Sequence, residues 1–378
     1  MFGRAGARRQ AGAAELVVTV SLLLAVGVVM ALSTTMADSP SLLANTQFLK
    51  QLTWLCLALA ALGLVAFIPA AWLRRAAFPL LLVAGAGLVA VLVPGLGSTV
   101  NGASRWFRFH GLSVQPSELA KLALVLGLAR WLGEKEERAR SFWAGYLPAI
   151  LVTGLMALLI LKEPDFGTAC LVGLIGVVMM FVAGVRVAYL LPTVLATLPA
   201  LWFLVSRSQY RMHRMLAFMD PWAYPDSIGF HVIQSLIALG SGGVYGVGLG
   251  QGQQKLSFLF EADTDFVFAV IGEELGFLGA LLVIGLFVVL IWQLFRIAER
   301  AGSRFGFLAA CGVGTWLGMQ ALVHIGVVSK ALPTKGIPLP FISCGGSSLL
   351  AAMVAVGVVL SIAREAAAGG GAAPREAP

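Results

Sequence analysis

Residues 264–296 read TDFVFAVIGEELGFLGALLVIGLFVVLIWQLFR. From Phe266 onward this stretch is apolar over more than the ~20 residues that a helix needs to cross the hydrocarbon core of a bilayer, so it predicts a membrane-spanning helix. Carboxylates lie just before and within it, at Glu261, Asp263, Asp265, Glu273 and Glu274. Because acidic groups beside or inside hydrocarbon are costly, this cluster is a candidate functional site; the alternative is a solvated loop end.

The composition extends this interpretation to the whole chain. Of the 378 residues, 59% are hydrophobic and only 12% are charged, and the mean hydropathy is +0.91. These values are typical of multispanning membrane proteins rather than of soluble domains. We therefore expect an all-α polytopic membrane protein. About ten transmembrane helices are predicted, near residues 15–36, 50–71, 77–94, 118–133, 146–162, 166–185, 188–206, 266–296, 306–328 and 346–363.

Basic residues predict the orientation of these helices. With a cytoplasmic N-terminus, every cytoplasmic segment carries arginine or lysine, as the positive-inside rule requires. Both termini are then cytoplasmic, and the longest connection, about residues 206–264 between helices seven and eight, is extracytoplasmic together with Asp265. The predicted organisation is an N-terminal segment (1–14), a transmembrane domain (15–363) and a disordered cytoplasmic tail (364–378). The net charge of +8 is spread over many segments, so no nucleic-acid partner is expected.

The large outer loop holds two further signals. Residues 230–239 are apolar but too short to span, which predicts an interfacial or re-entrant segment. Seven glycines follow between residues 240 and 252. They predict tight turns and close backbone approach rather than a phosphate-binding loop, since no GK[ST] follows. The GxxxG pairs Gly272/Gly276 and Gly314/Gly318 predict close helix packing.

Two further segments, 101–121 and 163–168, contain polar residues that fall on the same predicted side of the membrane as Asp265. Ser117 is a candidate N-cap, which places Glu118 in the first turn of a helix, where the helix dipole favours a carboxylate. Glu118 and Lys121 are three residues apart and share a helix face. They predict either an acid and base pair facing a cavity or a salt bridge at the helix end.

Three more carboxylates are assigned from their spacing to Asp265. Glu273 lies deeper along the same helix and is expected to line the cavity of Asp265, whereas Glu274 is expected to pair with a neighbouring helix. Asp263 and Asp265 are a candidate pair for a divalent cation such as Mg²⁺ or Mn²⁺, which oxygen ligands suit. We expect no organic cofactor, since the glycine run lacks a nucleotide-binding pattern and the four cysteines are scattered.

The charges on this side fit one class of reaction, the transfer of a sugar from a lipid diphosphate. The leaving diphosphate is a stable anion and needs cationic support rather than a proton, so a paired acid of the glycosidase kind is unnecessary. One carboxylate then suffices, as the general base for the attacking sugar hydroxyl.

At these motifs the chain resembles the SEDS family, whose FtsW and RodA members polymerise lipid II into glycan strands. The matching motifs follow the order of the family through most of the chain, and two of them, NGASRW and PTKG, look more like the septal FtsW type. They are NGASRW with QPSELAK (101–121), EPDFGT (163–168), RMLAFMDPW (214–222), IQSLIALGSGGVYGVGLGQGQQK (233–255), TDFVFAVIGEELG (264–276) and LPTKGIPLPFISCGGSSL (332–349).

The resemblance implies a peptidoglycan glycosyltransferase of the bacterial cytoplasmic membrane that acts on its outer face during cell division or elongation. It implies that Asp265 is the catalytic aspartate and that Glu118 and Lys121 shape its cavity. The reaction would be a single inverting displacement that releases polyprenyl diphosphate. Candidates for binding the diphosphate or the glycan are Arg105, Arg211, Arg214, Lys255 and Lys335, with Glu273 as a companion of the base. The implied partners are lipid II, the growing glycan strand, a class B penicillin-binding protein and other divisome or elongasome membrane proteins.

The chain departs from the family pattern near the base. Where the family usually reads LPEAHTDF, residues 259–266 read LFEADTDF, and the added charge of Asp263 predicts a raised pKa for Asp265 unless a cation lies between them. His231, His324 and Cys344 also replace the residues that the family usually has. Two alternative functions are a lipid II flippase, which would not need Asp265 as a base, and a non-catalytic scaffold that recruits division proteins.

Overall fold

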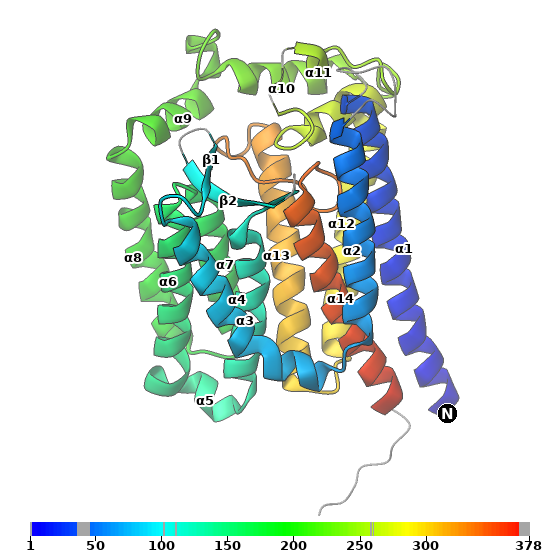
Figure 1. The fold of residues 1–378 in the computed structure, drawn as a ribbon, viewed down its shortest axis with the longest axis vertical. Coiled ribbons are helices and arrows are strands. Elements are labelled where there is room, and N and C mark those ends of the chain that lie inside the picture. Colours follow the sequence, from blue (N-terminus) through cyan, green and yellow to red (C-terminus); the bar gives the residue numbers. More distant parts are fainter. Residues whose placement is uncertain are drawn as a thin grey trace, which may run out of the picture.

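The computed structural model describes residues 2–35, 46–100, 103–109, 112–257, 259 and 261–369. Long helices run side by side as one bundle (Figure 1). The helices are α1 (Phe2–Thr35), α2 (Thr46–Phe67), α3 (Ala70–Val91), α4 (Pro116–Gly133), α5 (Glu136–Arg140), α6 (Leu147–Lys162), α7 (Phe166–Val182), α8 (Val187–Ser206), α9 (Gln209–Met219), α10 (Phe230–Ser241), α11 (Gln254–Ser257), α12 (Val267–Glu299), α13 (Arg304–Val328) and α14 (Gly346–Gly369), with a π-helical turn η1 (Phe142–Tyr146) and a 3₁₀ turn η2 (Pro221–Ala223).

Eight helices within the described residues are long and apolar enough to cross a membrane. They include α1, α2, α3, α8, α12, α13 and α14, and one continuous stretch from η1 through α6. Two further helices occupy predicted positions without meeting that criterion: α7 is only 17 residues long, and α4 carries Glu118, Lys121 and Arg130. The predicted class, a polytopic helical membrane protein, is confirmed.

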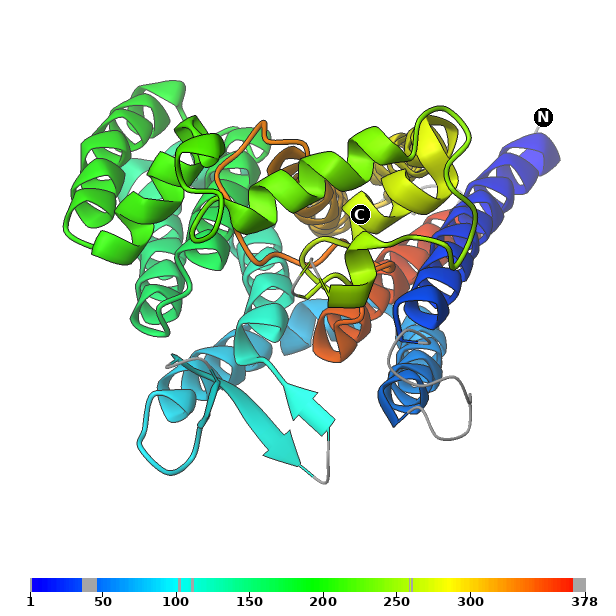
Figure 2. The ribbon, with the colours of Figure 1, turned by 90° about the horizontal axis from the view of Figure 1, so that it is seen from above.

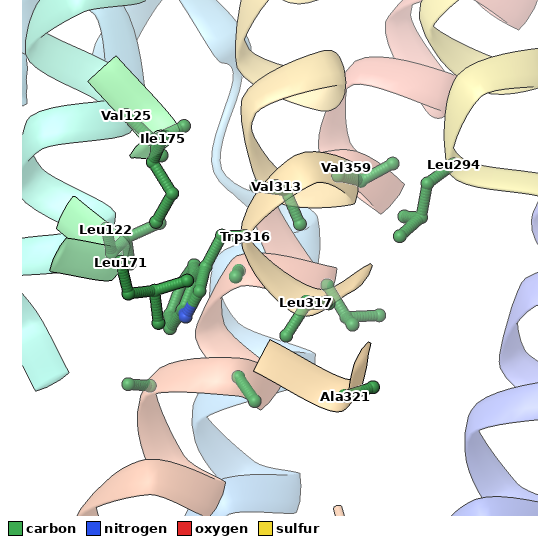
Figure 3. Packing of buried hydrophobic residues seen from close by; sticks show 14 of the residues in the cluster. Leu122, Val125, Leu171, Ile175, Leu294, Val313, Trp316, Leu317, Ala321 and Val359 are labelled. Carbon is green, nitrogen blue, oxygen red and sulfur yellow. The ribbon is translucent and has the colours of Figure 1, made fainter. Parts of the chain in front are cut away.

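The core forms around α13. Buried apolar side chains of α13 pack among those of α4, α7, α12 and α14 (Figure 3). They are Val313, Trp316, Leu317 and Ala321 of α13, Leu122 and Val125 of α4, Leu171 and Ile175 of α7, Leu294 of α12 and Val359 of α14. In the most apolar 18-residue stretch of each helix, 72% of the residues of α13 are buried, whereas only 6% of those of α8 are buried. An apolar helix that leaves most of its surface uncovered by protein is suited to contact with lipid.

A small sheet, absent from the all-α prediction, connects α3 to α4. Its three antiparallel strands are β1 (Ser98–Val100), β2 (Ala103–Phe109) and β3 (Leu112–Val114), with Ser98 opposite Trp106 and Phe107 opposite Val114. The connection is too short for a further spanning helix, and its aromatic residues favour strands. Viewed from above, the sheet projects to one side of the bundle (Figure 2).

The long connection between α8 and α12 is largely helical rather than an open loop. It contains α9, η2, α10 and α11, which lie together at one end of the bundle, here called the Asp265 end; α5 lies at the opposite end (Figure 1). The predicted interfacial segment is α10, a helix of 12 residues. It runs across this end of the bundle (Figure 2).

The helix predicted over residues 266–296 is interrupted. Gly276 has φ 68° and ψ −166° inside α12, a conformation that glycine adopts without steric penalty. The interruption exposes backbone groups that the glycine run pairs with: the N–H groups of Val247 and Gly248 donate to the carbonyl oxygens of Glu273 and Glu274, at 3.0 and 3.1 Å. The predicted close backbone approach is therefore a loop inserted into a helix break. Gly314 and Gly318 pack against Leu294 and Ile291 of α12, as predicted for close helix packing, and Gly272 packs against Leu239 of α10. For Gly276 that prediction is wrong, because it contacts the backbone of the inserted loop.

Helical structure extends past both predicted boundaries of the transmembrane domain. Described residues of the predicted N-terminal segment already belong to α1. At the other end α14 continues to Gly369, because Arg364 donates to the Phe67 carbonyl oxygen at 2.8 Å and Glu365 accepts from the Ala70 N–H at 2.6 Å. These contacts correct the prediction that residues 364–369 belong to a disordered tail. Residues 370–378 lie outside the described residues.

Candidate active site

Asp265 lies just before α12, partly buried at the Asp265 end. Its N–H donates to the Glu261 carbonyl oxygen at 3.0 Å. Burial raises the pKa of Asp265 to about 7, and the charge of Glu261 and a side-chain hydrogen bond to it add to this rise. The positive charge of Arg214 opposes the rise. A carboxyl of this kind is a suitable general base at neutral pH.

Asp263 contributes less than the sequence suggested. Its charge raises the pKa of Asp265, as predicted, but it does so less than burial and Glu261 do. The Asp263 carboxylate accepts from Gln47 Nε2 at 2.6 Å, and its carbonyl oxygen accepts from the Cys344 N–H at 2.9 Å. Asp263 thus ties the residues before α12 to α2 and to the chain before α14. Sequence reasoning counted Glu261 in the acidic run but did not predict that it contacts the base.

The loop between α13 and α14, residues 329–345, joins the separate parts of the site. Gly336 lies so close to the Asp265 carboxylate that a Cβ there would overlap Oδ2. The Thr334 carbonyl oxygen accepts from Arg214 Nη1 at 3.2 Å, and Ser343 Oγ donates to the Thr264 carbonyl oxygen at 2.6 Å. The loop therefore fixes the acid and the cations relative to one another.

Two of the predicted cations gather on the ring of Phe166, the first residue of α7. Lys335 Nζ lies 4.3 Å and the Arg211 guanidinium 5.0 Å from the ring centroid, within the range of cation–π attraction. Burial lowers the pKa of Lys335 to about 8, and the charge of Arg214 adds to this effect. The structure therefore gathers Arg211, Arg214 and Lys335 in one cluster, from which the charge of Arg214 reaches Asp265.

Glu118 and Lys121 form the ion pair that their spacing predicted. Lys121 Nζ lies 2.8 Å from Glu118 Oε1, with side-chain exposures of 1% and 4% respectively. Lys121 also donates to Gln320 Oε1 at 2.8 Å, and Gln320 Nε2 donates to the Pro338 carbonyl oxygen at 2.8 Å. The ion pair is thus connected to the 329–345 loop through Gln320. The N-cap of α4 is Gln115 rather than Ser117, because Pro116 occupies the first helical position.

Arg105 lies at the α6–α7 junction, where it acts on backbone. Its Nε donates to the Glu163 carbonyl oxygen at 2.7 Å and its Nη2 to the Pro164 carbonyl oxygen at 2.8 Å. Glu163 itself is fully buried, and neither of its carboxylate oxygens has a hydrogen-bond partner among the described residues. Burial raises the pKa of Glu163 to about 8, and the charge of Asp165 adds to this rise. The raised pKa favours the neutral form of Glu163 at pH 7. Sequence reasoning placed Glu163 in a polar segment of interest and gave it no role.

Glu273 and Lys255 lie away from the group around Asp265. The Glu273 carboxylate accepts from the N–H groups of Gln253 and Gln254, at 2.8 and 3.3 Å. Lys255 Nζ lies 2.6 Å from Glu274 Oε1 and 2.7 Å from Ser33 Oγ. These contacts hold the glycine-rich loop against α12 and α1. They correct the placement of Glu273 beside Asp265 and give Lys255 a buried structural partner, whereas Glu274 pairs with other elements, as predicted.

The residues present offer a divalent cation few ligands. The described residues contain no group of three or more His, Cys, Asp or Glu arranged to hold a metal ion. The two predicted metal ligands, Asp263 and Asp265, have different partners. The Asp263 carboxylate accepts from Gln47, and the carboxyl that contacts Asp265 is Glu261. Two carboxylates suffice for Mg²⁺ only when phosphate oxygens and water complete its shell.

Gly336→Ala is expected to reduce catalytic activity without reducing stability. The new methyl group would displace the Asp265 carboxylate, and a misplacement of about 1 Å can lower a rate by ~10²-fold. Gly345→Ala in the same loop is the matched control, because its Cβ would lie 3.5 Å from the nearest atom, an ordinary contact. Thermal unfolding in detergent and the rate of the proposed reaction are measured for both variants. Equal rates for the two would contradict a positioning role of Gly336.

The fold and the site together define a class of protein: a polytopic membrane protein with a carboxyl of near-neutral pKa at one end of its helix bundle and cations beside it. A family profile described as "Cell cycle protein", FTSW_RODA_SPOVE, matches residues 14–368. The chain therefore belongs to the FtsW/RodA/SpoVE family, as its motifs indicated.

Two similar sequences carry the same name. A protein of Geobacter metallireducens named "Probable peptidoglycan glycosyltransferase FtsW" is 45% identical over 289 residues, which cover 76% of this chain and 77% of that protein. A protein of Hahella chejuensis with the same name is 42% identical over 323 residues, covering 85% of this chain and 81% of that protein. The chain is therefore FtsW-like over most of its length.

Similar solved structures extend the likeness to the fold. A chain from a study of the structural coordination of polymerization and crosslinking by a peptidoglycan synthase complex has a TM-score of 0.77 at 32% identity, covering 93% of this chain and 97% of that chain. The rod shape determining protein RodA of Thermus thermophilus has a TM-score of 0.69 at 30% identity, covering 93% of this chain and 96% of that chain.

Proposed function

We propose that this protein is a peptidoglycan glycosyltransferase of the bacterial cytoplasmic membrane that polymerises lipid II into glycan strands, during cell division or elongation. The observation that carries the proposal is the Asp265 carboxyl, whose pKa of about 7 suits a general base. The positive charge of Arg214 acts on both Asp265 and Lys335, so base and cations belong to one site. The names of the similar proteins support the same reaction class. The Asp265 end is then the extracytoplasmic end.

In the proposed reaction, Asp265 accepts the proton of the attacking sugar hydroxyl as that oxygen bonds to the anomeric carbon of the donor. The bond from this carbon to the diphosphate breaks, and polyprenyl diphosphate leaves with the bonding electrons. A single displacement inverts the α-linked donor to a β-linked product. Arg211, Arg214 and Lys335 are placed to neutralise the diphosphate, which needs no proton. Glu118 and Lys121 position the 329–345 loop through Gln320, and Arg105 positions the start of α7 through the carbonyl oxygens of Glu163 and Pro164.

We propose that a divalent cation, Mg²⁺ or Mn²⁺, binds at Asp265. We propose Glu261 rather than Asp263 as its second ligand beside Asp265, because the Glu261 side chain is hydrogen-bonded to the base, whereas the Asp263 carboxylate accepts from Gln47. When bound, such a cation would supply positive charge to the diphosphate. The described residues provide no further carboxylate or imidazole for a complete protein site.

We further propose that a class B penicillin-binding protein is the partner of this protein and crosslinks the strands that it makes. The similar synthase complex, in which polymerization and crosslinking are coordinated, supports this assignment. Exposed apolar side chains on α8, such as Leu195, Leu198 and Trp202, form a surface that can contact lipid or a transmembrane segment of such a partner. Other divisome or elongasome membrane proteins would join the same assembly.

The function is tested with the purified protein and its transpeptidase partner in vesicles that carry lipid II on one membrane face only. Glycan polymer is expected when lipid II is on the face of the Asp265 end. Transport of lipid II across the membrane without polymer would replace the enzyme by the flippase alternative. Polymer formation with lipid II on the other face alone would reverse the proposed orientation.

The rate of polymerisation is expected to rise with pH through about 7, since only the deprotonated Asp265 accepts a proton. Below its pKa the rate falls about tenfold per pH unit. Glu261→Gln removes a negative charge and a hydrogen bond that raise the pKa of Asp265, so the acidic limb of the pH–rate profile should shift to lower pH. Asp263→Asn should shift it less, because Asp263 contributes less. An acidic limb that is unchanged in Glu261→Gln would exclude Glu261 as the neighbour that tunes the base.

A further inference from the structure

A basic cavity lies at the end of the bundle opposite Asp265. Its volume is about 480 Å³. It forms where the first turns of α3 and α13 meet the last turns of α4 and α14, and it is lined by Ala70, Ala71, Arg74, Arg75, Arg130, Gly133, Glu134, Ser303, Arg304, Phe305 and Glu365. The proposed glycosyltransferase mechanism uses none of these residues.

The lining carries an excess of positive charge. It contains four guanidinium groups and two carboxylates, and both carboxylates have other partners: Glu134 pairs with Arg138, and Glu365 accepts from the Ala70 N–H. Arg304 is partly compensated, since it lies 3.4 Å from Glu136. Arg74, Arg75 and Arg130 therefore leave the cavity positive.

One of these arginines is held in place by the backbone. Arg130 Nη1 donates to the carbonyl oxygens of Arg74 and Arg75, at 3.0 and 2.9 Å, and its guanidinium stacks 4.3 Å from the centroid of the Phe78 ring. It thereby fixes the first turns of α3 against α4. The cavity is thus a built feature of the fold, rather than a chance gathering of surface arginines.

The chemistry of the lining favours a phosphate. Guanidinium groups bind phosphate oxygens in a bidentate manner. The N-termini of α3 and α13 also lie at this cavity, and their dipoles favour anions, while the Ala70 N–H of α3 is already bound by Glu365. A carboxylate would gain less from several forked donors than a phosphate with more oxygens.

The position of the cavity indicates that the phosphate belongs to a lipid. Phe67 and Trp72, on either side of the α2–α3 corner, are 73% and 61% exposed, and Arg75 stacks 5.5 Å from the Trp72 ring centroid. Exposed aromatic residues at the ends of spanning helices mark the headgroup level of a bilayer. At that level, basic pockets between helices bind anionic headgroups.

We propose that this cavity binds the phosphate of an anionic phospholipid headgroup. Arg74 and Arg75 contact the phosphate from the open side, and Arg130 holds the floor. Occupancy joins α3, α4, α13 and α14 at this end. The other ends of α13 and α14 carry the 329–345 loop and that of α4 carries the Glu118–Lys121 pair, so the bound lipid stabilises the bundle below the candidate active site.

The proposal is tested by native mass spectrometry of the full chain in detergent, titrated with phosphatidylglycerol or with zwitterionic phosphatidylcholine. Wild-type protein should retain phosphatidylglycerol selectively. Arg74→Gln with Arg75→Gln should weaken retention by about fivefold for each arginine. Ala71→Glu should weaken it as well, because it adds a negative charge to the lining while all four arginines stay in place.

Matched controls lie at the same end of the bundle, outside the cavity. Val187→Glu makes the same change of charge as Ala71→Glu, and Arg186→Gln removes one arginine, both at the exposed start of α8. Both variants should leave phosphatidylglycerol retention unchanged. Equal retention by the cavity variants and these controls would overturn the proposal. Displacement of phosphatidylglycerol by inorganic phosphate at equal concentration would show that the site selects free phosphate, which would overturn the lipid assignment. Unchanged unfolding temperatures confirm that the variants are folded.

Discussion

Asp265→Asn is expected to lower the rate of lipid II polymerisation by at least about 10²–10⁴-fold, the range that a positioned general base contributes. The substitution keeps the shape of the side chain and removes its ability to accept the proton. Glu261 cannot replace it, because Glu261 is exposed and Asp265 is the carboxyl that faces Gly336. The measurement is glycan polymer formed from lipid II by the purified protein with its transpeptidase partner.

Asp263→Asn is the matched control, since it makes the same chemical change two residues away. It should retain polymerisation, because the Asp263 carboxylate is bound by Gln47 and an asparagine oxygen accepts the same hydrogen bond. The assay is run with and without Mg²⁺ or Mn²⁺. Loss of polymer in Asp263→Asn that excess cation restores would return Asp263 to the proposed metal site. Cells that grow normally with Asp265→Ala as the sole copy would favour the non-catalytic scaffold.

Lys121→Met is expected to destabilise the fold by about 3–5 kcal/mol, because it leaves the Glu118 carboxylate buried without its cation. The two side chains are almost fully buried and lie 2.8 Å apart. The measurement is thermal or denaturant unfolding in detergent. Arg140→Ala is the matched control: it breaks the exposed ion pair with Glu136, with side-chain exposures of 63% and 61%, and should change stability by less than about 1 kcal/mol.

The double variant Glu118→Gln/Lys121→Met separates stability from function. Replacing a buried ion pair by uncharged groups of similar volume is often neutral or stabilising, so most of the lost stability should return. If polymerisation also returns, the pair serves only the fold. We expect it to stay reduced, because Lys121 supports the 329–345 loop through Gln320. A double variant as unstable as Lys121→Met would contradict the ion-pair explanation.

The order and type of the spanning helices could be predicted from the sequence, because a bilayer requires long apolar helices and tolerates few alternatives. The pairing of Glu118 with Lys121 followed from the same regularity, since residues three apart on a helix share a face. The break at Gly276 did not follow. A glycine inside an apolar run is compatible with an intact helix, and only the inserted glycine loop determines that it is interrupted here.

The candidate site was predictable in its base and in part of its cations. Asp265, Arg211, Arg214 and Lys335 were named from motif resemblance and charge, and the structure brings them together. Glu273 and Lys255 were named on the same grounds and lie elsewhere, because their partners are backbone N–H groups and Glu274 in the loop inserted at the break. Spacing along a helix indicates direction and depth, but it does not reveal which distant segment covers that face.

By itself, the sequence determined the membrane class, the helical segments, the family motifs and the identity of the proposed base, because each of these depends on local composition and period. Only the tertiary structure decided which acid tunes Asp265 and which cations reach it. The local turn brings Glu261 against the base, and the other contacts join segments far apart in the chain: Gly336 packs against Asp265, and Lys335 and Arg211 meet on Phe166. Electrostatic interactions depend on these distances and on burial, which no local pattern of residues specifies.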